Sequence, residues 1–136
     1  MRNKEKAERV LWNYRMNVKK AEEMRLIYSW LMSVRGQDYG AHIVNGVSDA
    51  VLDVVYRKMA IEKKIKRLER EVQAVEQVQS SLDIRELRDS QMLGILQRRY
   101  MEHKEPDRVM REMGITKPTY YRRNNELIEK MKEYVD

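Results

Sequence analysis

Side chains that can hydrogen-bond to the edges of nucleic-acid bases gather in a short stretch near the C-terminus. Residues 116–125 contain threonine, lysine, tyrosine, arginine and asparagine in close succession. Arginine can pair with guanine through two hydrogen bonds, and asparagine can do the same with adenine. If this stretch is helical, its outward side chains contact base edges or nearby phosphates; we predict them to be Thr116, Lys117, Thr119, Tyr121, Arg122 and Asn125.

A second set of basic side chains flanks and overlaps this stretch. Residues 98–123 carry eight basic and four acidic residues, in a chain whose net charge is +6. Cations beside a base-reading surface bind phosphates and set the docking angle without reading sequence. We assign this role to Arg98, Arg99, Lys104, Arg108 and Arg123. Each residue of both sets could instead be an ordinary solvated side chain with no role in DNA binding. Arg99 could also form an internal salt bridge.

The composition argues against catalysis and against a cofactor. The chain has no cysteine and two histidines, His42 and His103, which lie far apart without a nucleophile or ligand spacing between them. The run from Tyr120 to Arg123 suggests a recombinase tyrosine, but such a site needs more arginines and histidines from a larger domain. We therefore predict no enzymatic activity, no metal and no cofactor.

No membrane partner is expected either. No apolar stretch reaches the roughly 18 residues that a membrane-spanning helix needs, and no signal-peptide pattern opens the chain. These features predict a cytoplasmic protein. The basic charge balance makes double-stranded DNA a better-fitting partner than a lipid surface.

The elements expected around the candidate residues form a helix-turn-helix. Residues 90–102 predict one helix, and residues 106–113 predict a shorter one that begins at Pro106. Gly114 then suits a left-handed helix stop, and Thr116 suits the cap of a last helix over residues 117–134. The inner faces of these helices are predicted to carry Leu93, Leu96, Tyr100, Val109, Met110, Met113, Tyr120, Leu127, Met131 and Tyr134.

Residues 93–131 resemble region 4 of bacterial sigma factors. The motifs that carry this resemblance are a Leu with an Arg-Tyr pair, a Gly-Ile-Thr turn, a Thr-apolar pair and a later apolar pair. In this sequence they are Leu96, Arg99, Tyr100, Gly114, Ile115, Thr116, Thr119, Tyr120, Leu127 and Ile128. The sequence departs from the family at three positions. The family usually has alanine where this chain has Met110, valine or isoleucine where it has Tyr120, and an apolar residue where it has Arg123.

Taken with its long-helical N-terminal half, the chain resembles the small sigma-like regulators of phages and prophages, of the RinA and ArpU types. That resemblance implies a sequence-specific DNA-binding regulator, and in particular a late-gene activator that acts with bacterial RNA polymerase. The sequence has no recognisable counterpart of region 2, the part of a full sigma factor that binds the core polymerase. An accessory activator therefore fits better than a complete sigma factor.

The N-terminal half predicts two long helices. Residues 4–35 form the first, and a heptad pattern marks the second, which opens at Ser48 and Asp49 and runs to about Leu82. Because a glycine-bearing loop at residues 36–47 joins them, the simplest arrangement is an antiparallel hairpin; the alternative is an intermolecular coiled coil. On a continuous first helix Trp12 and Trp30 share one direction, either inside a packed face or on a partner surface.

Together these elements predict an all-α protein with two parts. Residues 1–83 are expected to form a helical hairpin or coiled coil for oligomerisation, and residues 84–136 a helix-turn-helix domain. The apolar surplus of the first part predicts a homodimer. Two other functions remain open: a small terminase subunit for DNA packaging, which usually places its DNA-binding motif first, and a helical adaptor whose motif binds only protein.

Overall fold

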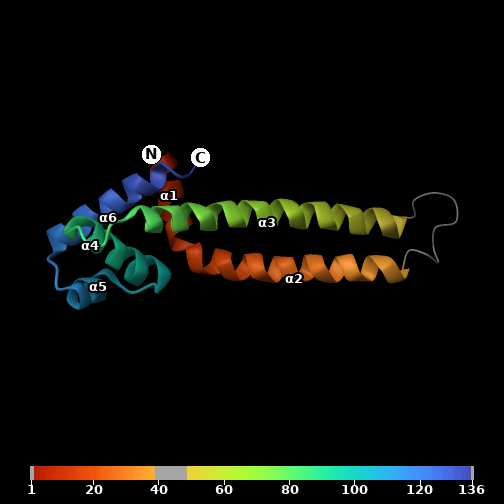
Figure 1. Cartoon of the computed structure of the whole chain (residues 1–136), viewed down its shortest axis with the longest axis horizontal. Helices are drawn as coiled ribbons and strands as arrows, with labels where there is room; N and C mark the ends of the chain where they lie inside the picture. Colours follow the sequence, from red (N-terminus) through yellow and green to blue (C-terminus); the bar gives the residue numbers. More distant parts are fainter. Residues whose placement is uncertain (1, 39–48, 136) are drawn as a thin grey trace. The chain divides into compact units, whose positions relative to one another are not determined.

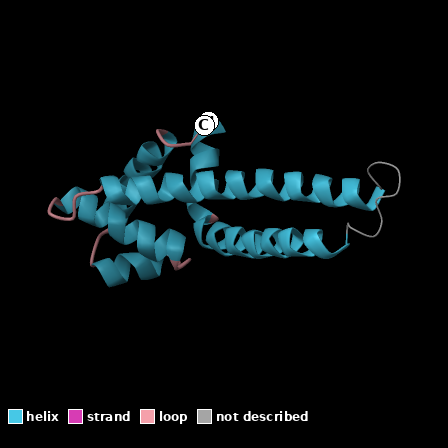
Figure 2. Cartoon of the chain, turned by 45° about the vertical axis from the view of Figure 1, so that its right-hand side comes forward, coloured by secondary structure: helices cyan, strands magenta, loops and turns pink. Residues whose placement is uncertain are grey.

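The computed structural model describes residues 2–38 and 49–135, and all regular structure in those ranges is helical (Figures 1 and 2). The all-α prediction is confirmed. The helices are α1 (Arg2–Trp12), α2 (Tyr14–Asp38), α3 (Asp49–Ser81), α4 (Leu87–Ile95), α5 (Pro106–Met113) and α6 (Lys117–Lys132), and a π-helical segment η1 (Leu96–Met101) follows α4 directly.

The chain divides into two compact units. Unit 1 combines Met1–Asn17 with Arg70–Asp136, and unit 2 is Val18–Glu69. This division differs from the predicted boundary at residue 83. The reason is that apolar residues of α1 and of the last turns of α3 complete the core of the C-terminal helices, so both segments belong to that core.

Unit 2 is an antiparallel pair formed by α2 and α3, as the hairpin prediction expected (Figure 1). The charged position that interrupts the heptad of α3 is Lys58, whose Nζ lies 5.5 Å from the centre of the Tyr28 ring. This cation–π contact lets a lysine occupy the seam. Arg25 of α2 also pairs with Glu69 of α3 at 2.6 Å, which links the two helices at their surface.

Unit 1 holds an extensive core built from all of its helical segments. α1 packs against α6 and η1, and α4 packs against α6, η1 and α5. The buried hydrophobic side chains of this core are Ala7, Val10, Leu11, Ala74, Val75, Val78, Leu82, Met92, Ile95, Leu96, Tyr100, Val109, Tyr120, Leu127, Ile128 and Met131. Many of these were predicted on inner faces. Tyr134 was predicted there too, but it is 38% exposed, because α6 ends at Lys132 before reaching it.

The first predicted helix is interrupted. A turn at Asn13 separates α1 from α2, although the N–H of Asn13 donates to the carbonyl of Arg9 and the N–H of Asn17 to that of Asn13. Trp12 and Trp30 therefore lie on different helices and in different units, not on one continuous helix.

Some predicted helix ends are confirmed: α5 begins at Pro106 and ends at Met113, and α6 begins at Lys117. The bend predicted over residues 80–90 is shorter than expected, because α3 continues to Ser81 and α4 begins at Leu87, before the predicted start at residue 90. α2 continues through Gly36 to Asp38; the rest of the predicted loop and the Ser48 cap lie outside the described residues.

Candidate nucleic-acid interface

α6 is held in place by its inner face. Tyr120, Leu127, Ile128 and Met131 are buried against the helices of unit 1, so the opposite side of the first turns of α6 faces solvent. Burial raises the pKa of the Tyr120 phenol, and the nearby Arg99 guanidinium opposes that shift. The register of the interface helix therefore depends on apolar packing.

The turn before α6 has the geometry that the sequence predicted. Gly114 adopts φ 64°, ψ 37°, which is the left-handed conformation that glycine enters without strain. The N–H of Ile115 donates to the carbonyl of Met110 at 3.1 Å, which closes the end of α5. Met110 itself is half-buried and packs against the core.

The predicted base-reading residues are mostly exposed. All are exposed on or just before α6 except Thr119, which is half-buried. Thr116 has the extended backbone of an N-cap residue, but its Oγ1 donates to Oγ1 of Thr119 at 3.0 Å. The predicted side-chain cap at Thr116 is therefore wrong: the two hydroxyls bond to each other and leave the N-terminal N–H groups of α6 uncapped by this side chain.

Two of these residues carry positive charges that stand alone. Over residues 2–38 and 49–135, neither Lys117 nor Arg122 forms an ion pair. Arg122 and Asn125 line an open groove of about 540 Å³ between α6 and the start of α4, together with acidic and basic side chains of both helices. The arrangement brings the arginine and the asparagine predicted to read bases to one surface.

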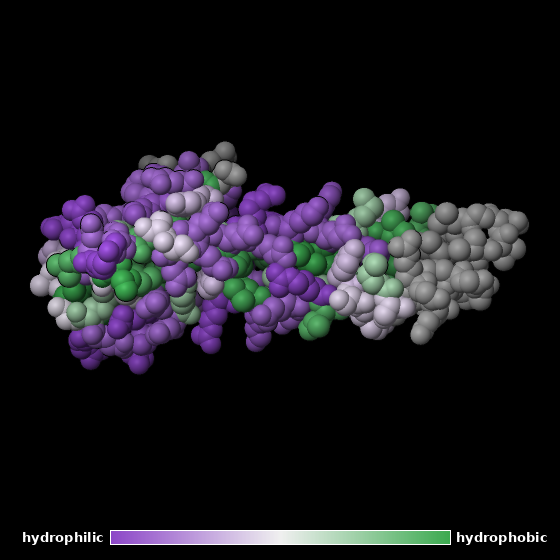
Figure 3. Space-filling view, viewed as in Figure 1, coloured by the Kyte–Doolittle hydropathy of each residue, from purple (hydrophilic) through white to green (hydrophobic). Residues whose placement is uncertain are grey.

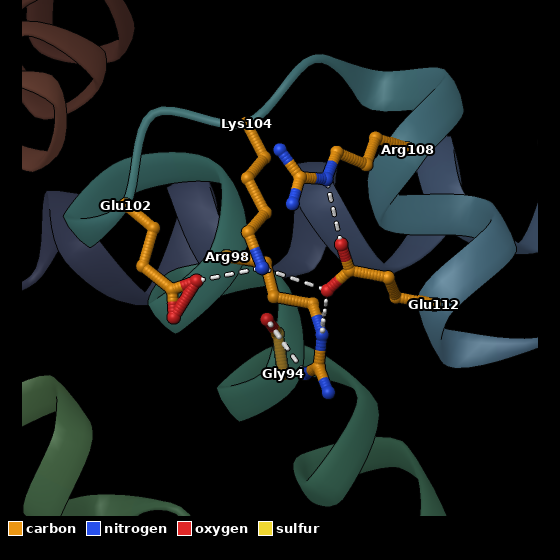
Figure 4. Close-up of polar contacts among 6 residues, drawn as sticks. All are labelled: Gly94, Arg98, Glu102, Lys104, Arg108 and Glu112. Atoms are coloured by element: carbon orange, nitrogen blue, oxygen red, sulfur yellow. Dashed lines mark hydrogen bonds and ion pairs between the residues drawn. The ribbon is translucent and has the colours of Figure 1, made fainter.

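The predicted phosphate contacts have a different environment, because three of them converge on one carboxylate. Glu112 lies 2.7 Å from Nζ of Lys104, 2.9 Å from Nε of Arg108 and 3.4 Å from Nε of Arg98 (Figure 4). Lys104 also pairs with Glu102 at 2.9 Å. Lys104 above all holds the pKa of Glu112 below its usual value, and Glu112 above all raises the pKa of Lys104. The positive charge of this cluster is thus partly neutralised within the protein.

The other two predicted phosphate contacts are internal. Arg99 donates from Nη1 to the carbonyl of Lys104 at 3.1 Å, and its guanidinium lies 4.7 Å from the centre of the Trp12 ring. Arg123 donates from Nε to Gln91 at 2.8 Å and from Nη1 to Glu126 at 2.9 Å, and its side chain is only 13% exposed. Both arginines were predicted to contact phosphates, with an internal salt bridge as the alternative for Arg99. Instead, a hydrogen bond and a ring contact hold Arg99, and Gln91 of α4 together with Glu126 holds Arg123.

Sequence reasoning missed two residues of this region. Arg111, in the last turn of α5, is exposed and pairs with no acidic side chain in the described part of the chain. Glu112 is the centre of the cation cluster; its spacing from Arg108 was a signal for one pair, but its contact with Lys104 depends on the fold. Arg111 is the better-placed candidate for a phosphate contact.

Neither metal binding nor a membrane span gains support from the described residues. Among them, no three or more histidine, aspartate or glutamate side chains gather closely enough to hold a metal ion. No helix in the described ranges is both long and apolar enough to cross a bilayer.

The fold and the candidate interface define an all-α protein whose chain ends in a helix-turn-helix arrangement. The chain belongs to the family described as protein of unknown function (DUF1492), whose model matches residues 34–132. That match covers α3 and everything from α4 to α6, including the whole candidate interface. Searches of curated proteins and of solved structures gave no match.

Proposed function

We propose that the protein is a sequence-specific DNA-binding regulator of transcription that places the first turns of α6 in the major groove. The observation that carries this proposal is the pair of exposed, unpaired cations Lys117 and Arg122 on a helix whose opposite face is buried. Unpaired cations retain their full attraction for phosphates and base edges, and the N-terminal end of a helix adds a positive dipole.

The finer proposal rests on the resemblance to region 4 of sigma factors. We propose a phage or prophage late-gene activator that works as a homodimer with RNA polymerase in the bacterial cytoplasm, without catalytic activity. The Gly114 turn and the buried Tyr120, Leu127 and Ile128 support it, because they lie where that family places its turn and its inner face.

A helical adaptor is the second candidate, and one observation favours it. Glu112 neutralises part of the charge of Arg98, Lys104 and Arg108, which a DNA-binding surface would leave free. A motif with such paired charges suits a protein partner. The hypothesis of a small terminase subunit has less support, because the helix-turn-helix follows the long helices here instead of preceding them.

The test begins with selection of bound sequences from a random DNA pool, and then compares two arginine variants. Arg122→Ala is expected to reduce the preference for the selected site by about 1–3 kcal/mol, because a base-reading contact is lost. Arg111→Ala is the matched control: it should weaken selected and random DNA alike and lower the salt slope by about one. Both side chains are exposed, so melting temperatures should change little.

Affinities are measured for both duplexes at several salt concentrations. If Arg122→Ala leaves the ratio of the two affinities unchanged, α6 does not read the bases. If the wild-type chain binds neither duplex, the adaptor becomes the better proposal.

A further inference from the structure

The start of α3 exposes large apolar side chains on the side of the helix that faces away from α2. Four of them are between 40% and 66% exposed: Leu52, Val55, Tyr56 and Met59. Their spacing of three, four and seven residues places them on one side of the helix, called here the apolar half of the outer face. Figure 3 shows hydrophobic surface near the start of α3.

The same side of α3 continues into cations. Lys63, Lys66 and Arg67 follow Met59 by four, seven and eight residues, which is again helical spacing, and all three are exposed. None of them forms an ion pair within the described part of the chain. They are called here the cationic half of the outer face. From Leu52 to Arg67 the outer face extends for about 22 Å, or roughly four helical turns.

No carboxylate of this stretch lies on the outer face to neutralise these cations. Residues 52–67 hold two acidic side chains, Asp53 and Glu62. Asp53 pairs with Arg57 at 3.2 Å on the flank of the helix. Glu62 accepts a hydrogen bond from the hydroxyl of Tyr28 at 2.7 Å, which places it on the side of α3 that faces α2. The cationic half therefore keeps its attraction for an anionic group.

The order of the two halves along the helix discriminates between anionic partners. The phosphates of a nucleic acid match the cationic half, but a duplex presents charge along its whole length and leaves the apolar half without a partner. A helix that lies on an anionic membrane needs apolar side chains along its full length, with cations at its sides. On α3 the apolar and cationic side chains follow one another on a single side, so neither surface matches both halves.

A second copy of the outer face is mismatched as well. In an antiparallel pair of outer faces, each cationic half lies on the apolar half of the other copy, and in a parallel pair the cations face each other. A helix of a different protein can have the complementary order. Its apolar side chains would then cover Tyr56 and Met59, and its carboxylates would pair with Lys63, Lys66 and Arg67.

We propose that the outer face of α3 binds an acidic amphipathic helix of another protein. Amphipathic helices commonly bind through apolar anchors at helical spacing, and Tyr56 belongs to a residue type that often dominates binding energy. An antiparallel orientation suits the helix dipole, because it places the carboxylates in the first turns of the partner helix. The proposal goes beyond the proposed function, because no residue of α6 takes part and no DNA needs to be bound.

Selection from a displayed library of helical peptides on the full chain tests this proposal. The peptides have about 18 residues, enough to span the outer face, and are randomised on one side of the helix. The wild-type chain is expected to enrich peptides with Asp or Glu in the N-terminal half and large apolar residues in the C-terminal half. The triple variant Lys63→Glu, Lys66→Glu, Arg67→Glu should enrich Lys or Arg in place of the acidic residues, since the charge of the face is reversed. If the wild-type chain enriches no peptide with the first pattern, the proposal is wrong.

Affinities of a selected peptide, measured by fluorescence anisotropy, map the contact with two matched pairs of variants. Lys66→Glu is expected to weaken binding at least about tenfold, whereas Lys19→Glu, at an exposed lysine of α2, should leave it unchanged. Tyr56→Ala should also weaken binding at least about tenfold, whereas Leu26→Ala, at an exposed leucine of α2, should not. Circular dichroism checks that all four variants remain helical. Equal effects within either pair contradict the assigned face.

Random duplex DNA and vesicles of phosphatidylserine with phosphatidylcholine test the other anionic surfaces. Lys66→Glu and Lys19→Glu change the charge equally, so they should affect binding to these probes equally. A larger loss for Lys66→Glu would mean that the outer face binds phosphate groups, and the proposal would be overturned. The two proposals stay distinct: a chain that binds the acidic peptide and no DNA refutes only the proposed function, and a chain that binds DNA and no acidic peptide refutes only the partner helix.

Discussion

The two units bury apolar side chains to very different extents. Unit 1 encloses a core to which α1, the end of α3, and all the helices from α4 to α6 contribute. In unit 2, the only side chains that are buried among the described residues are Ala21, Leu31 and Leu68. A helix with one neighbour can bury one face only, whereas helices that surround a centre bury several. Unit 1 thus encloses a core from several sides, whereas unit 2 leaves large apolar side chains exposed.

The backbone shows the same contrast. Unit 1 contains the turn at Asn13, the π-helical segment η1, and the positive φ angles of His103 and Gly114. His103 follows η1 and stacks on Trp12, with the ring centres 3.9 Å apart. Irregular backbone of this kind is common near functional sites, because it points side chains where regular helices do not. The described residues of unit 2 show regular helix alone.

The largest effect is expected from truncating the two cores. Leu127→Ala in unit 1 should destabilise the chain by about 4–5 kcal/mol, and Leu68→Ala in unit 2 by about 2 kcal/mol. Both leucines are buried, but Leu127 is surrounded by several helices, while Leu68 packs in a two-helix seam that relaxes more easily. Urea denaturation followed by circular dichroism measures both. Equal losses would remove the energetic distinction between the units.

The second-largest effect is expected from the pH dependence of stability, which the buried phenol of Tyr100 causes in unit 1. Tyr100 is buried in unit 1 and donates its hydroxyl to Oδ1 of Asn124 at 2.6 Å; burial raises its pKa to about 12. Since the folded state favours the neutral phenol, this stability is fully present below pH 10 and is lost as the pH rises toward 12. The loss amounts to about 2–3 kcal/mol.

The comparison uses phenylalanine at the same position. Tyr100→Phe should be less stable than wild type at neutral pH by about 1 kcal/mol, because Asn124 loses its partner. Between pH 10 and 12 wild type should lose this lead, because phenylalanine has no phenol to ionise, and Tyr100→Phe should become the more stable of the two. Denaturation curves at several pH values test this, with Tyr56→Phe in exposed surface of unit 2 as the control. Parallel curves for Tyr100→Phe and wild type would show that the phenol is not sequestered.

A glycine substitution tests the special backbone of unit 1. Gly114→Ala should cost about 1–2 kcal/mol, because alanine must adopt φ 64°. No atom lies within 4 Å of the added Cβ, so the cost comes from the backbone alone. Gly94→Ala is the informative companion: its Cβ meets Cε of the flexible Met113 side chain at 2.7 Å, and side-chain rotation should relieve most of that clash. Thermal melts compare the two, and an unaltered melting temperature for Gly114→Ala would contradict the strained turn.

Sequence patterns predicted the elements well and the side-chain contacts poorly. Proline, glycine and apolar spacing identified both ends of α5 and the start of α6, because those signals are local. The turn at Asn13 was missed, since no glycine or proline marks it. Buried Asn17, which donates to Glu71 at 2.9 Å, depends on a contact between α2 and α3 that periodicity cannot reveal.

The candidate interface shows the same limit. Helical phase correctly predicted exposed side chains on α6, at Lys117, Tyr121, Arg122 and Asn125. Helical phase could not distinguish free cations from paired ones, because the pairing depends on the fold. Glu112 of α5 pairs with Lys104 in the connection that precedes this helix, and Arg123 of α6 bonds to Gln91 of α4. Charge counting along the chain therefore overestimated the positive surface of the helix-turn-helix.

The smallest expected effect concerns that neutralised cluster. Glu112→Gln should release Arg98, Lys104 and Arg108 from their shared carboxylate, strengthen non-specific DNA binding and steepen its salt dependence by about one counterion. Asp107→Asn is the control, because it removes the same charge from exposed surface of the same helix without freeing a paired cation. Affinity for random duplex DNA is measured over a series of salt concentrations. If the two variants change it equally, the cluster around Glu112 does not face DNA, and only the unpaired cations at the end of α5 and the start of α6 contact phosphates. If Glu112→Gln alone strengthens binding, this carboxylate moderates non-specific attraction, which leaves discrimination between sites to Arg122 and its neighbours on α6.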